Sequence, residues 1–395
     1  MKLKDIFEKP ISGEWGKEVG EGEKGSKVIR TTNFTNIGRL DLSSIVERDI
    51  DSIKHENKKL KFGDIIIEKS GGSPTQPVGR VVIFEETNED VYFCNNFTSI
   101  LRPNKNIVPK FGLYLLKNLY NKKKVLKFQN KTTGIINIKL NDYLNNTEIT
   151  IPNLEVQNRI AEVLNKTQEL IDKRKEQIES LDELVKSKFI EMFGDPITNS
   201  KEWNTFELRE GIKEIKYGTS KPPIFSEEGI PFVRATNIKF GRIIENDMKY
   251  ISEYEAEKIE KCKLSLGDTI IVRSGANTGD NAFVSEEYVG SYGGYDIIVK
   301  LNEKINYIFL NALLNSIYRE TIIQPLTRRA GQPHLNSEQI QSLVIYNPPI
   351  ELQNQFADFV KQVDKLKFEM EKSLKELEDN FNSLMQKAFR GELFK

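Results

Sequence analysis

The chain has 395 residues, and its 58 Lys and Arg balance its 58 Asp and Glu, so the formal net charge is zero. Hydrophobic residues make up 38% and charged residues 29%, a composition that fits a folded globular protein and excludes a disordered one. The 2 Cys and 2 His lie far apart in sequence, which excludes a zinc-finger motif and a disulfide framework.

The sequence contains neither a membrane-spanning segment nor the pattern of a secretory signal peptide. The longest aliphatic runs, such as Ile65–Ile67 and Ile270–Val272, are far shorter than the roughly 20 residues that cross a bilayer. The opening segment MKLKDIFEKPISGEWG has no apolar core of a signal peptide. We therefore expect a cytoplasmic protein with no membrane partner and no metal site of its own.

Residues 1–150 form the first expected domain. Short β-type runs, including Val81–Phe84 and Ile149–Ile151, alternate with turns, and one stretch, Phe111–Tyr120, is helix-like. This mixture predicts a compact α/β domain. Residues 101–150 hold 10 Lys and Arg but 2 Asp and Glu, with the densest run in Asn121–Lys131. Such a run is either a solvated face or a surface for a polyanion, and the sequence leaves both open.

Residues 151–195 form the second segment, where the pattern changes to one long charged helix without internal Gly or Pro. Apolar residues recur every seven positions, which is the pattern of a coiled coil, and the alternative is a helix packed on its own domain. At about 1.5 Å per residue, some 38 helical residues span about 57 Å, so the helix is expected to act as a spacer. The proposed seam residues are Leu164, Ile171, Ile178, Val185 and Met192.

Residues 196–347 repeat the first domain, and residues 348–395 repeat the helix. VIRTTNFTNIGRL matches FVRATNIKFGRI, and LKFGDIIIEKSGG matches LSLGDTIIVRSGA, both at an offset of about 204. Several blocks in the same order indicate a duplication. The second helix repeats the heptad pattern and is the natural partner of the first. Its expected seam residues are Met370, Leu374, Leu377, Phe381 and Leu384.

Enzyme motifs are few, so we expect no catalytic residues. Asn347-Pro348-Pro349-Ile350 resembles the Asn-Pro-Pro-aromatic motif of amino-methyltransferases, but the aromatic residue is missing. A P-loop and a Gly-rich dinucleotide loop are also absent from the sequence. Cys94 and Cys262 do not occupy matching positions of the repeat, and we expect each to be a buried small hydrophobe.

Polar and basic residues of glycine-containing loops are the candidates for a binding site. Arg and Lys can bridge guanine O6 and N7, Asn and Gln can bridge adenine, and Ser and Thr hold phosphates. The alternative is that the small polar residues only shape turns. The candidate DNA-binding residues are Arg30, Thr32, Asn33, Lys69, Ser70, Lys122, Lys123, Lys124, Thr132, Thr133, Arg234, Thr236, Asn237, Arg273, Ser274, Arg328, Arg329 and Gln332.

Together, the repeat and three short motifs resemble the specificity (S) subunit of type I restriction–modification enzymes over essentially the whole chain. The motif P-x-x-E-x-Q-N occurs at Pro152–Asn158 and Pro348–Asn354, and Met192–Pro196 follows the first helix. Gly331-Gln332 leads into the second linker, whereas the first copy has Gly134-Ile135 there, which leaves its contacts at that loop open.

The resemblance implies an α/β (α+β) fold with two similar target recognition domains, separated by two long helices that form an antiparallel coiled coil. Residues 1–150 and 196–347 would each read one half of a bipartite, asymmetric double-stranded DNA site, and residues 151–195 and 348–395 would be the helical spacers. The subunit would be non-catalytic and prokaryotic. Two methylation (M) subunits would bind S-adenosylmethionine, and two restriction (R) subunits would use ATP and Mg²⁺.

Two other functions remain open at this point. The chain could be a fragment of a DNA adenine methyltransferase or of a fused restriction–methylation enzyme, which binding of S-adenosylmethionine would reveal. It could also be a coiled-coil interaction protein that does not read DNA. The sequence does not identify the bases recognised, because loop residues correspond to bases only through geometry.

Overall fold

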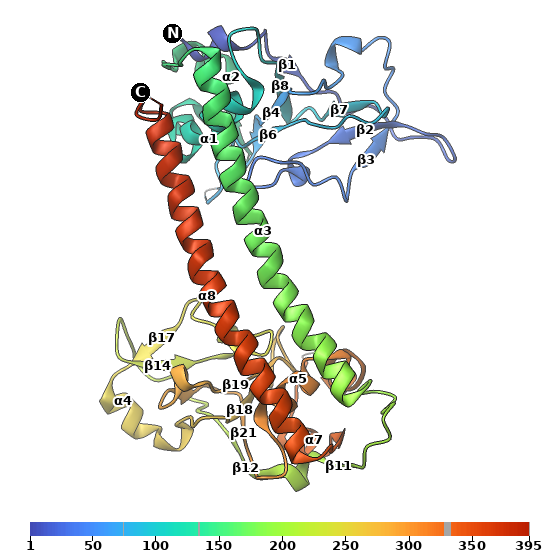
Figure 1. The fold of residues 1–395 in the computed structure, drawn as a ribbon, viewed down its shortest axis with the longest axis vertical. Helices are drawn as coiled ribbons and strands as arrows, with labels where there is room; N and C mark the ends of the chain where they lie inside the picture. Colours follow the sequence, from blue (N-terminus) through green and yellow to red (C-terminus); the bar gives the residue numbers. More distant parts are fainter. Residues whose placement is uncertain (74, 133–134, 328–332, 395) are drawn as a thin grey trace. The chain divides into compact units, whose positions relative to one another are not determined.

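The computed structural model describes residues 1–73, 75–132, 135–327 and 333–394 (Figure 1). The chain divides into two compact units. Unit 1 contains Met1–Arg174 and Ser373–Lys395, and unit 2 contains Lys175–Lys372. Each unit therefore combines one globular domain with parts of both long helices, whereas the sequence-based division treats the helices as separate segments.

The described residues of unit 1 form three sheets. The main sheet is antiparallel in the order β1-β8-β4-β6, the second has the order β3-β2-β7 with β2 and β7 parallel, and the third has the order β5-β10-β9. The strands are β1 (Ile11–Ser12), β2 (Ser26–Ile29), β3 (Val46–Arg48), β4 (Ile65–Glu68), β5 (Ser70–Gly71), β6 (Val81–Ile83), β7 (Tyr92–Cys94), β8 (Thr98–Leu101), β9 (Gln129–Thr132) and β10 (Ile135–Ile138). The short helices are η1 (Leu3–Ile6), η2 (Thr31–Asn33), η3 (Glu56–Lys58), α1 (Pro109–Asn121), η4 (Lys124–Phe128) and α2 (Leu140–Asn146).

Unit 2 is built on the same plan, as the sequence repeat predicts. Its main sheet is antiparallel in the order β12-β21-β18-β19, and its second sheet has the order β13-β17-β14-β20. The strands are β11 (Thr205–Glu207), β12 (Ile212–Tyr217), β13 (Phe225–Ser226), β14 (Ile230–Val233), β15 (Ile238–Lys239), β16 (Arg242–Ile243), β17 (Lys249–Ile251), β18 (Thr269–Ile271), β19 (Asn281–Phe283), β20 (Tyr292–Gly293), β21 (Ile297–Leu301) and β22 (Val344–Tyr346). The helical segments are η5 (Leu208–Gly211), η6 (Ala235–Asn237), α4 (Glu253–Lys258), η7 (Glu260–Cys262), η8 (Glu286–Tyr288), α5 (Tyr307–Leu314), the π-helix η9 (Arg319–Ile323), α6 (Gln324–Thr327) and α7 (Ser337–Gln341).

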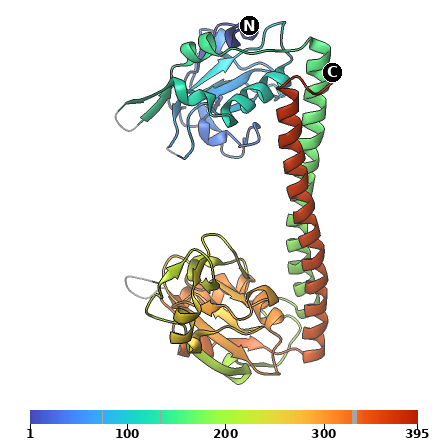
Figure 2. The same ribbon diagram turned by 90° about the vertical axis from the view of Figure 1, so that its left-hand side faces the viewer.

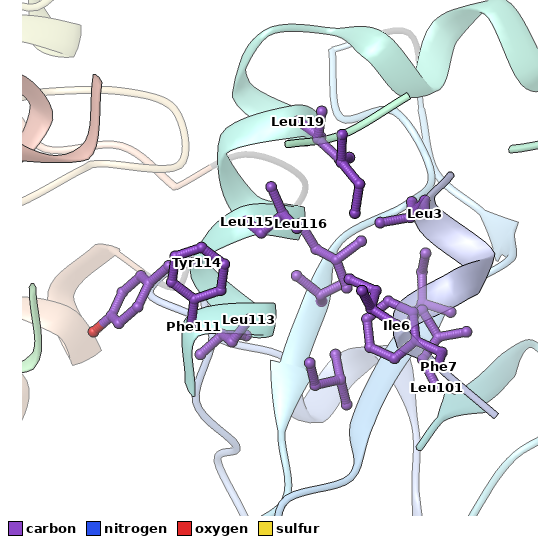
Figure 3. Packing of buried hydrophobic residues seen from close by; sticks show 14 of the residues in the cluster. Leu3, Ile6, Phe7, Leu101, Phe111, Leu113, Tyr114, Leu115, Leu116 and Leu119 are labelled. Carbon is purple, nitrogen blue, oxygen red and sulfur yellow. The ribbon is translucent and has the colours of Figure 1, made fainter. Parts of the chain in front are cut away.

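Helix α1 closes the core of the first domain. Its apolar residues, among them Phe111, Leu115 and Leu119, belong to the same buried cluster as Leu3 and Ile6 of η1 (Figure 3). Burial of one large apolar side chain contributes about 1.5–3 kcal/mol, so this cluster is a main source of the domain's stability. Cys94 and Cys262 are buried and free, as expected.

The two long helices, α3 (Leu154–Phe193) and α8 (Ile350–Ala388), pack side by side within each unit (Figures 1 and 2). In unit 1 the beginning of α3 meets the end of α8, since Leu164 shares a cluster with Leu384. In unit 2 the end of α3 meets the beginning of α8, since Phe189 shares a cluster with Phe356. The coiled coil predicted from the heptads is confirmed, and the two helices run antiparallel, as the family resemblance implies.

The proposed seam residues lie on the inner faces of these helices. Leu164 and Ile171 are buried. The remaining seam residues are half-buried: Ile178, Val185, Met192, Met370, Leu374, Leu377, Phe381 and Leu384. Phe381 also contacts Tyr114 of α1, with ring centroids 6.1 Å apart, so the seam continues into the core of the first domain.

The glutamine of each P-x-x-E-x-Q-N motif joins a globular domain to its long helix. Gln353 is fully buried; its Nε2 donates to the Pro348 carbonyl at 2.8 Å, and its Oε1 accepts from the Asn306 backbone N–H at 2.9 Å. Gln157 does the same with Pro152 at 3.0 Å and Val108 at 2.9 Å. Each glutamine therefore ties the first turn of a long helix to the segment that starts α1 or α5.

A second tie joins each domain to its own helix further along. Arg39 donates to Asp172 on α3 at 2.6 Å, and Arg242 makes the matching ion pair with Asp364 on α8. Because Arg39 and Arg242 follow Gly38 and Gly241 in the corresponding turns, the two copies make the same contact. Each domain is thus held on its helix at two separated points.

Helix α3 ends where the sequence predicts, whereas one predicted strand does not form. Gly194 has a φ of +81° after α3, the left-handed conformation expected of a glycine that ends a helix. The strand expected at Ile149–Ile151 is wrong. Its partner segment holds the 3₁₀ helix η1, so pairing there is limited to a bridge between Lys2 and Glu148 and to hydrogen bonds between Met1 and Ile149.

Gln353→Ala tests the joint between domain and helix. The change leaves the half-buried Asn306 N–H and the Pro348 carbonyl without their partner, which costs about 1–3 kcal/mol of unfolding free energy. Gln355→Ala, two residues away on the exposed face of α8, is the matched control and should be neutral. Chemical unfolding of both variants gives the comparison, and equal stability would contradict the role of the Gln353 hydrogen bonds.

Candidate nucleic-acid interface

A short turn with the sequence Arg-x-x-Asn begins at the same place in both domains. It follows β2 at Arg30 and β14 at Arg234, and it forms η2 and η6. The backbone N–H of Arg30 donates to Asn33 Oδ1 at 2.9 Å, and that of Arg234 donates to Asn237 Oδ1 at 3.1 Å. The sequence match between the copies thus corresponds to one shared turn geometry.

The two asparagines of this turn do not face solvent. Asn33 and Asn237 are fully buried, and their Nδ2 groups donate to backbone carbonyls of Asp41 at 2.9 Å and of Asn246 at 3.0 Å. We therefore remove them from the candidate DNA contacts, because hydrogen bonds that hold the turn already occupy the carboxamides. This is the turn-shaping role that the sequence left open. Thr32 and Thr236, between Arg and Asn, are exposed.

The two turn arginines are half-buried and partly engaged. Arg30 Nη2 donates to the Ser44 carbonyl at 3.0 Å, and Arg234 Nη2 donates to Asp247 Oδ2 at 3.0 Å. The Nε groups of both are buried and have no hydrogen-bond partner among the described residues. In each domain a hydrogen bond to one neighbouring loop holds the guanidinium group near the surface. A guanidinium has five N–H donors, so others can bond a ligand.

Lys69 and Ser70 follow β4 at the end of the main sheet of the first domain. The Lys69 ammonium donates to Ser12 Oγ at 2.5 Å, and Ser70 Oγ donates to Asn137 Oδ1 at 2.6 Å. Burial lowers the pKa of Lys69, because a charged ammonium loses solvation there. The half-buried ammonium is therefore an incompletely solvated cation at the rim of the sheet.

Arg273 takes the equivalent place in the second domain and has a different environment. Its guanidinium lies between the rings of Tyr217 and Tyr295, 4.4 Å from each centroid, and Nη2 lies 3.1 Å from His334 Nε2. Tyr217, Tyr295 and His334 are missing from the sequence candidates. Sequence spacing could not reveal them, since three different strand ends and the Pro333–Leu335 segment bring them together.

In each domain one hydrogen bond to the Arg-x-x-Asn turn places this turn beside the loop that follows β4 or β18. In the first domain, Arg80 donates to the Thr31 carbonyl at 3.3 Å while it pairs with Glu68 at 3.0 Å, directly before Lys69. In the second domain, Asn277 Nδ2 donates to the Ala235 carbonyl at 3.5 Å. Each domain therefore gathers two of the candidate loops into one surface region.

The β9–β10 hairpin borders the same region of the first domain, since Asn137 pairs with Ser70 across β10 and β5. Thr132 is the last residue of β9. Lys122, Lys123 and Lys124 are exposed at the end of α1, where η4 leads into β9. Ser274 pairs with His334 in the second domain. Thr133, Arg328, Arg329 and Gln332 lie outside the described residues.

Among the residues that the structure describes, no group of three or more His, Cys, Asp or Glu side chains is placed to hold a metal ion. No helix in the same ranges is long and apolar enough to cross a membrane. The candidate interface consists of arginines, lysines, hydroxyls and exposed aromatic rings, which are groups that contact nucleic acids.

Comparison with known proteins identifies the family. Residues 1–180 and 200–379 each match the family described as type I restriction modification DNA specificity domain. The chain belongs to this family, and the two matched segments correspond to its two repeats.

Individual relatives agree with this assignment. The chain is 25% identical to the type I restriction enzyme EcoKI specificity subunit of Escherichia coli K12, over 93% of this chain and 82% of that protein. It is also 25% identical to the MjaVIII specificity subunit of Methanocaldococcus jannaschii, over 71% and 70%. The crystal structure of an S subunit from M. genitalium has the same fold, with a TM-score of 0.58 at 18% identity, covering 98% of this chain and 95% of that one.

Asp296, beneath Arg273, gives a pH-dependent test of the site. Burial raises the pKa of this carboxyl to about 6, and the neighbouring Arg273 opposes the shift only in part. Since the folded pKa lies above the unfolded one, the protonated form stabilises the fold at pH 4, and this stabilisation is lost as the pH rises through about 6. Asp296→Asn should therefore stabilise unit 2 at pH 7.5.

The expected gain at pH 7.5 is about 1–3 kcal/mol, and it should vanish near pH 4. An asparagine oxygen can still accept the hydrogen bond that the Arg273 backbone N–H now donates to Asp296 Oδ1. Thermal unfolding at both pH values measures the difference, with Asp358→Asn on the exposed face of α8 as control. An equal effect at pH 4 and pH 7.5 would contradict the burial argument.

Proposed function

We propose that this chain is the DNA-reading specificity subunit of a type I restriction–modification complex. The observation that carries the proposal is the duplication: two domains with one sheet topology hold different side chains at matching loop positions. Lys69 in one domain corresponds to Arg273 in the other. Such a pair of domains suits an asymmetric DNA target in two parts, with each domain reading one half.

The catalytic steps then belong to partner subunits. Two methylation subunits would bind S-adenosylmethionine and modify adenines, and two restriction subunits would use ATP and Mg²⁺, as the family resemblance implies. This chain would direct both activities to one sequence. Its net charge of zero fits this division, because the methylation subunits would share the work of neutralising the DNA backbone. The proposed location is the cytoplasm of a prokaryote.

The methyltransferase alternative finds no support at its one candidate motif. Asn347 Oδ1 lies 3.3 Å from Gln353 Nε2 and accepts its hydrogen bond, while Pro348 and Pro349 directly precede α8. These residues form the joint between the domain and its helix. An interaction protein without DNA reading is also unsupported, since the family match covers both domains.

Co-expression with a type I methylation subunit tests the function. Single-molecule methylation sequencing of host DNA should reveal methylated adenines in two short sequences, separated by a fixed stretch of unspecified bases. Methylation at a continuous site, or at no defined site in an active complex, would contradict the proposal. Purification of the chain without any bound methylation subunit would favour the interaction-protein alternative.

The helices supply the second test, because we propose that their length sets the spacing of the two half-sites. Deleting residues 171–177 of α3 and 370–376 of α8 removes one heptad from each helix and keeps the seam facing its partner. Glu179 then takes the helix position of Asp172, so a carboxylate still faces Arg39. One heptad spans about 10 Å, close to three base-pair steps of about 3.4 Å. We expect the same two half-sites with a shorter spacer.

The control is a deletion of five residues from each helix at the same places, which rotates the seam away and should abolish assembly. Methylation sequencing of the seven-residue deletion gives the result. An active complex that keeps the original spacer would contradict the proposal that the helices set the spacing, while half-site sequences that change would contradict the assignment of sequence reading to the globular domains.

Lys122, Lys123 and Lys124 test the electrostatic part of binding. These exposed lysines lie at the end of α1. Replacing all three by glutamine should weaken binding to every DNA sequence and reduce the slope of log affinity against log salt by about 1 for each phosphate that is no longer bound. Binding of the complex across a salt series measures this slope. An unchanged slope would make the run a solvated face.

A further inference from the structure

A four-residue site recurs at the same end of the main sheet in both domains. In the second domain it consists of Tyr217, Arg273, Tyr295 and His334. In the first domain the matching residues are Ser12, Lys69, Phe97 and Asn137. Since both sheets have the same antiparallel order, three of the four positions are neighbouring strand ends: the last residue of β1 or β12, a residue after β4 or β18, and a residue before β8 or β21.

The backbone contacts establish that these positions correspond. Gly13 N–H donates to the Thr98 carbonyl at 3.3 Å, and Gly218 N–H donates to the Asp296 carbonyl at 2.9 Å. A Cβ on Gly13 or Gly218 would lie 2.0 or 1.6 Å from a backbone oxygen, so both strand ends need glycine for the same close approach.

The fourth position of the site, Asn137 in the first domain and His334 in the second, also matches between the domains. Ile138 N–H donates to the Lys69 carbonyl at 2.9 Å, and Leu335 N–H donates to the Arg273 carbonyl at 2.8 Å. These bonds place Asn137 and His334, one residue earlier in the chain, beside the site in their respective domains. The frame is therefore the same in both domains while all four side chains differ.

The second-domain site holds its arginine in a fixed plane. Tyr217 and Tyr295 enclose the guanidinium from both faces, and the Tyr217 hydroxyl accepts from the Ser337 backbone N–H at 2.9 Å, which fixes that ring. Arg273 Nε is buried and has no hydrogen-bond partner among the described residues. Among the described residues no hydrogen bond engages Nη1 or the second hydrogen of Nη2, so these donors can bond a ligand.

Both aromatic positions next to the cation are open to solvent. Tyr295 is 46% exposed, and Phe97 at the matching position is 47% exposed. A large apolar ring that is this exposed in both copies does not serve the core. Nucleic acid offers flat partners for such rings and acceptor pairs for a planar guanidinium. Arginine fits guanine because two parallel N–H groups match O6 and N7.

We propose that these four positions are the base-selecting site of each recognition domain, and that Arg273, held by Tyr217 and Tyr295, selects a guanine in one half-site. Lys69, beside Phe97, contacts a base in the other half-site as a single cation without a second parallel donor. This inference rests on the proposed DNA-reading function and deepens it by naming the selecting positions and the base.

Arg273→Lys is the decisive variant. It keeps the positive charge and most of the side-chain stem, and it removes the planar fork that can bond two acceptors and stack between rings. In the methylation-sequencing assay we expect the preference for guanine at one position of one half-site to fall about 10-fold or more, with the other half-site unchanged. Arg273→Gln and Tyr295→Leu should relax the same position.

Controls separate this inference from the proposed function. The wild-type complex must first yield a bipartite site, and failure there would count against the proposed function. Arg209→Gln, at an exposed arginine paired with Glu207 and Glu338, should leave both half-sites unchanged. Lys69→Gln should alter only the half-site that Arg273→Lys leaves intact.

Three results would overturn the assignment. Unchanged selection in Arg273→Lys would overturn it for the second domain, and unchanged selection in Lys69→Gln would overturn it for the first. Weaker methylation with the same sequence preference at both half-sites, together with a smaller salt slope, would show that Arg273 contacts phosphate instead of a base.

Discussion

The joint between each globular domain and its long helix is the constraint on which the proposed function depends. A helix can set a distance only if the domain at its end is fixed to it. Gln157 and Gln353 provide this fixation through buried hydrogen bonds to both sides of the joint. Arg39 and Arg242 add a second attachment on the same helices, at Asp172 and Asp364. A second attachment further along the helix restricts rotations of the domain that a single attachment would allow.

The two copies share the same backbone arrangement but differ in the charged side chains that surround it. Asp64 and Asp268 occupy matching positions after a glycine that both copies share, and each accepts a backbone N–H at 2.8 Å. In the first domain Arg102 pairs with Asp64 at 2.8 Å. In the second domain the structure gives Asp268 no ion pair among the described residues, and burial raises the pKa of this carboxyl. The two domains therefore tolerate different charges around one backbone, as the proposed reading of two different half-sites requires.

Much of the architecture follows from the sequence because its signals are local or repeated. Heptads predict the helices, the repeat predicts two equivalent domains, and the P-x-x-E-x-Q-N motif marks the joints. The candidate site was only partly predictable. Arg273 was found through its repeat partner Lys69, but Tyr217 and Tyr295 lie 56 and 22 residues away in sequence and meet Arg273 only through sheet pairing. Asn33 and Asn237 show the reverse limit, since a motif shared by both copies reflected a buried turn and not a contact surface.

A lysine between the two long helices shows how the helices keep their register. Lys367 lies between the buried Val363 and the seam residue Met370, and it is itself buried. Its ammonium is 2.6 Å from both carboxylate oxygens of Asp182 on α3. An apolar residue there would pack equally well against several positions of the partner helix. A buried lysine instead requires its carboxylate, because an unpaired charge in the seam is strongly destabilising. Sliding one helix by a heptad, about 10 Å, would separate this pair and would also change the spacing that the helices are proposed to set. The ion pair thus restricts the helix register on which the proposed half-site spacing depends.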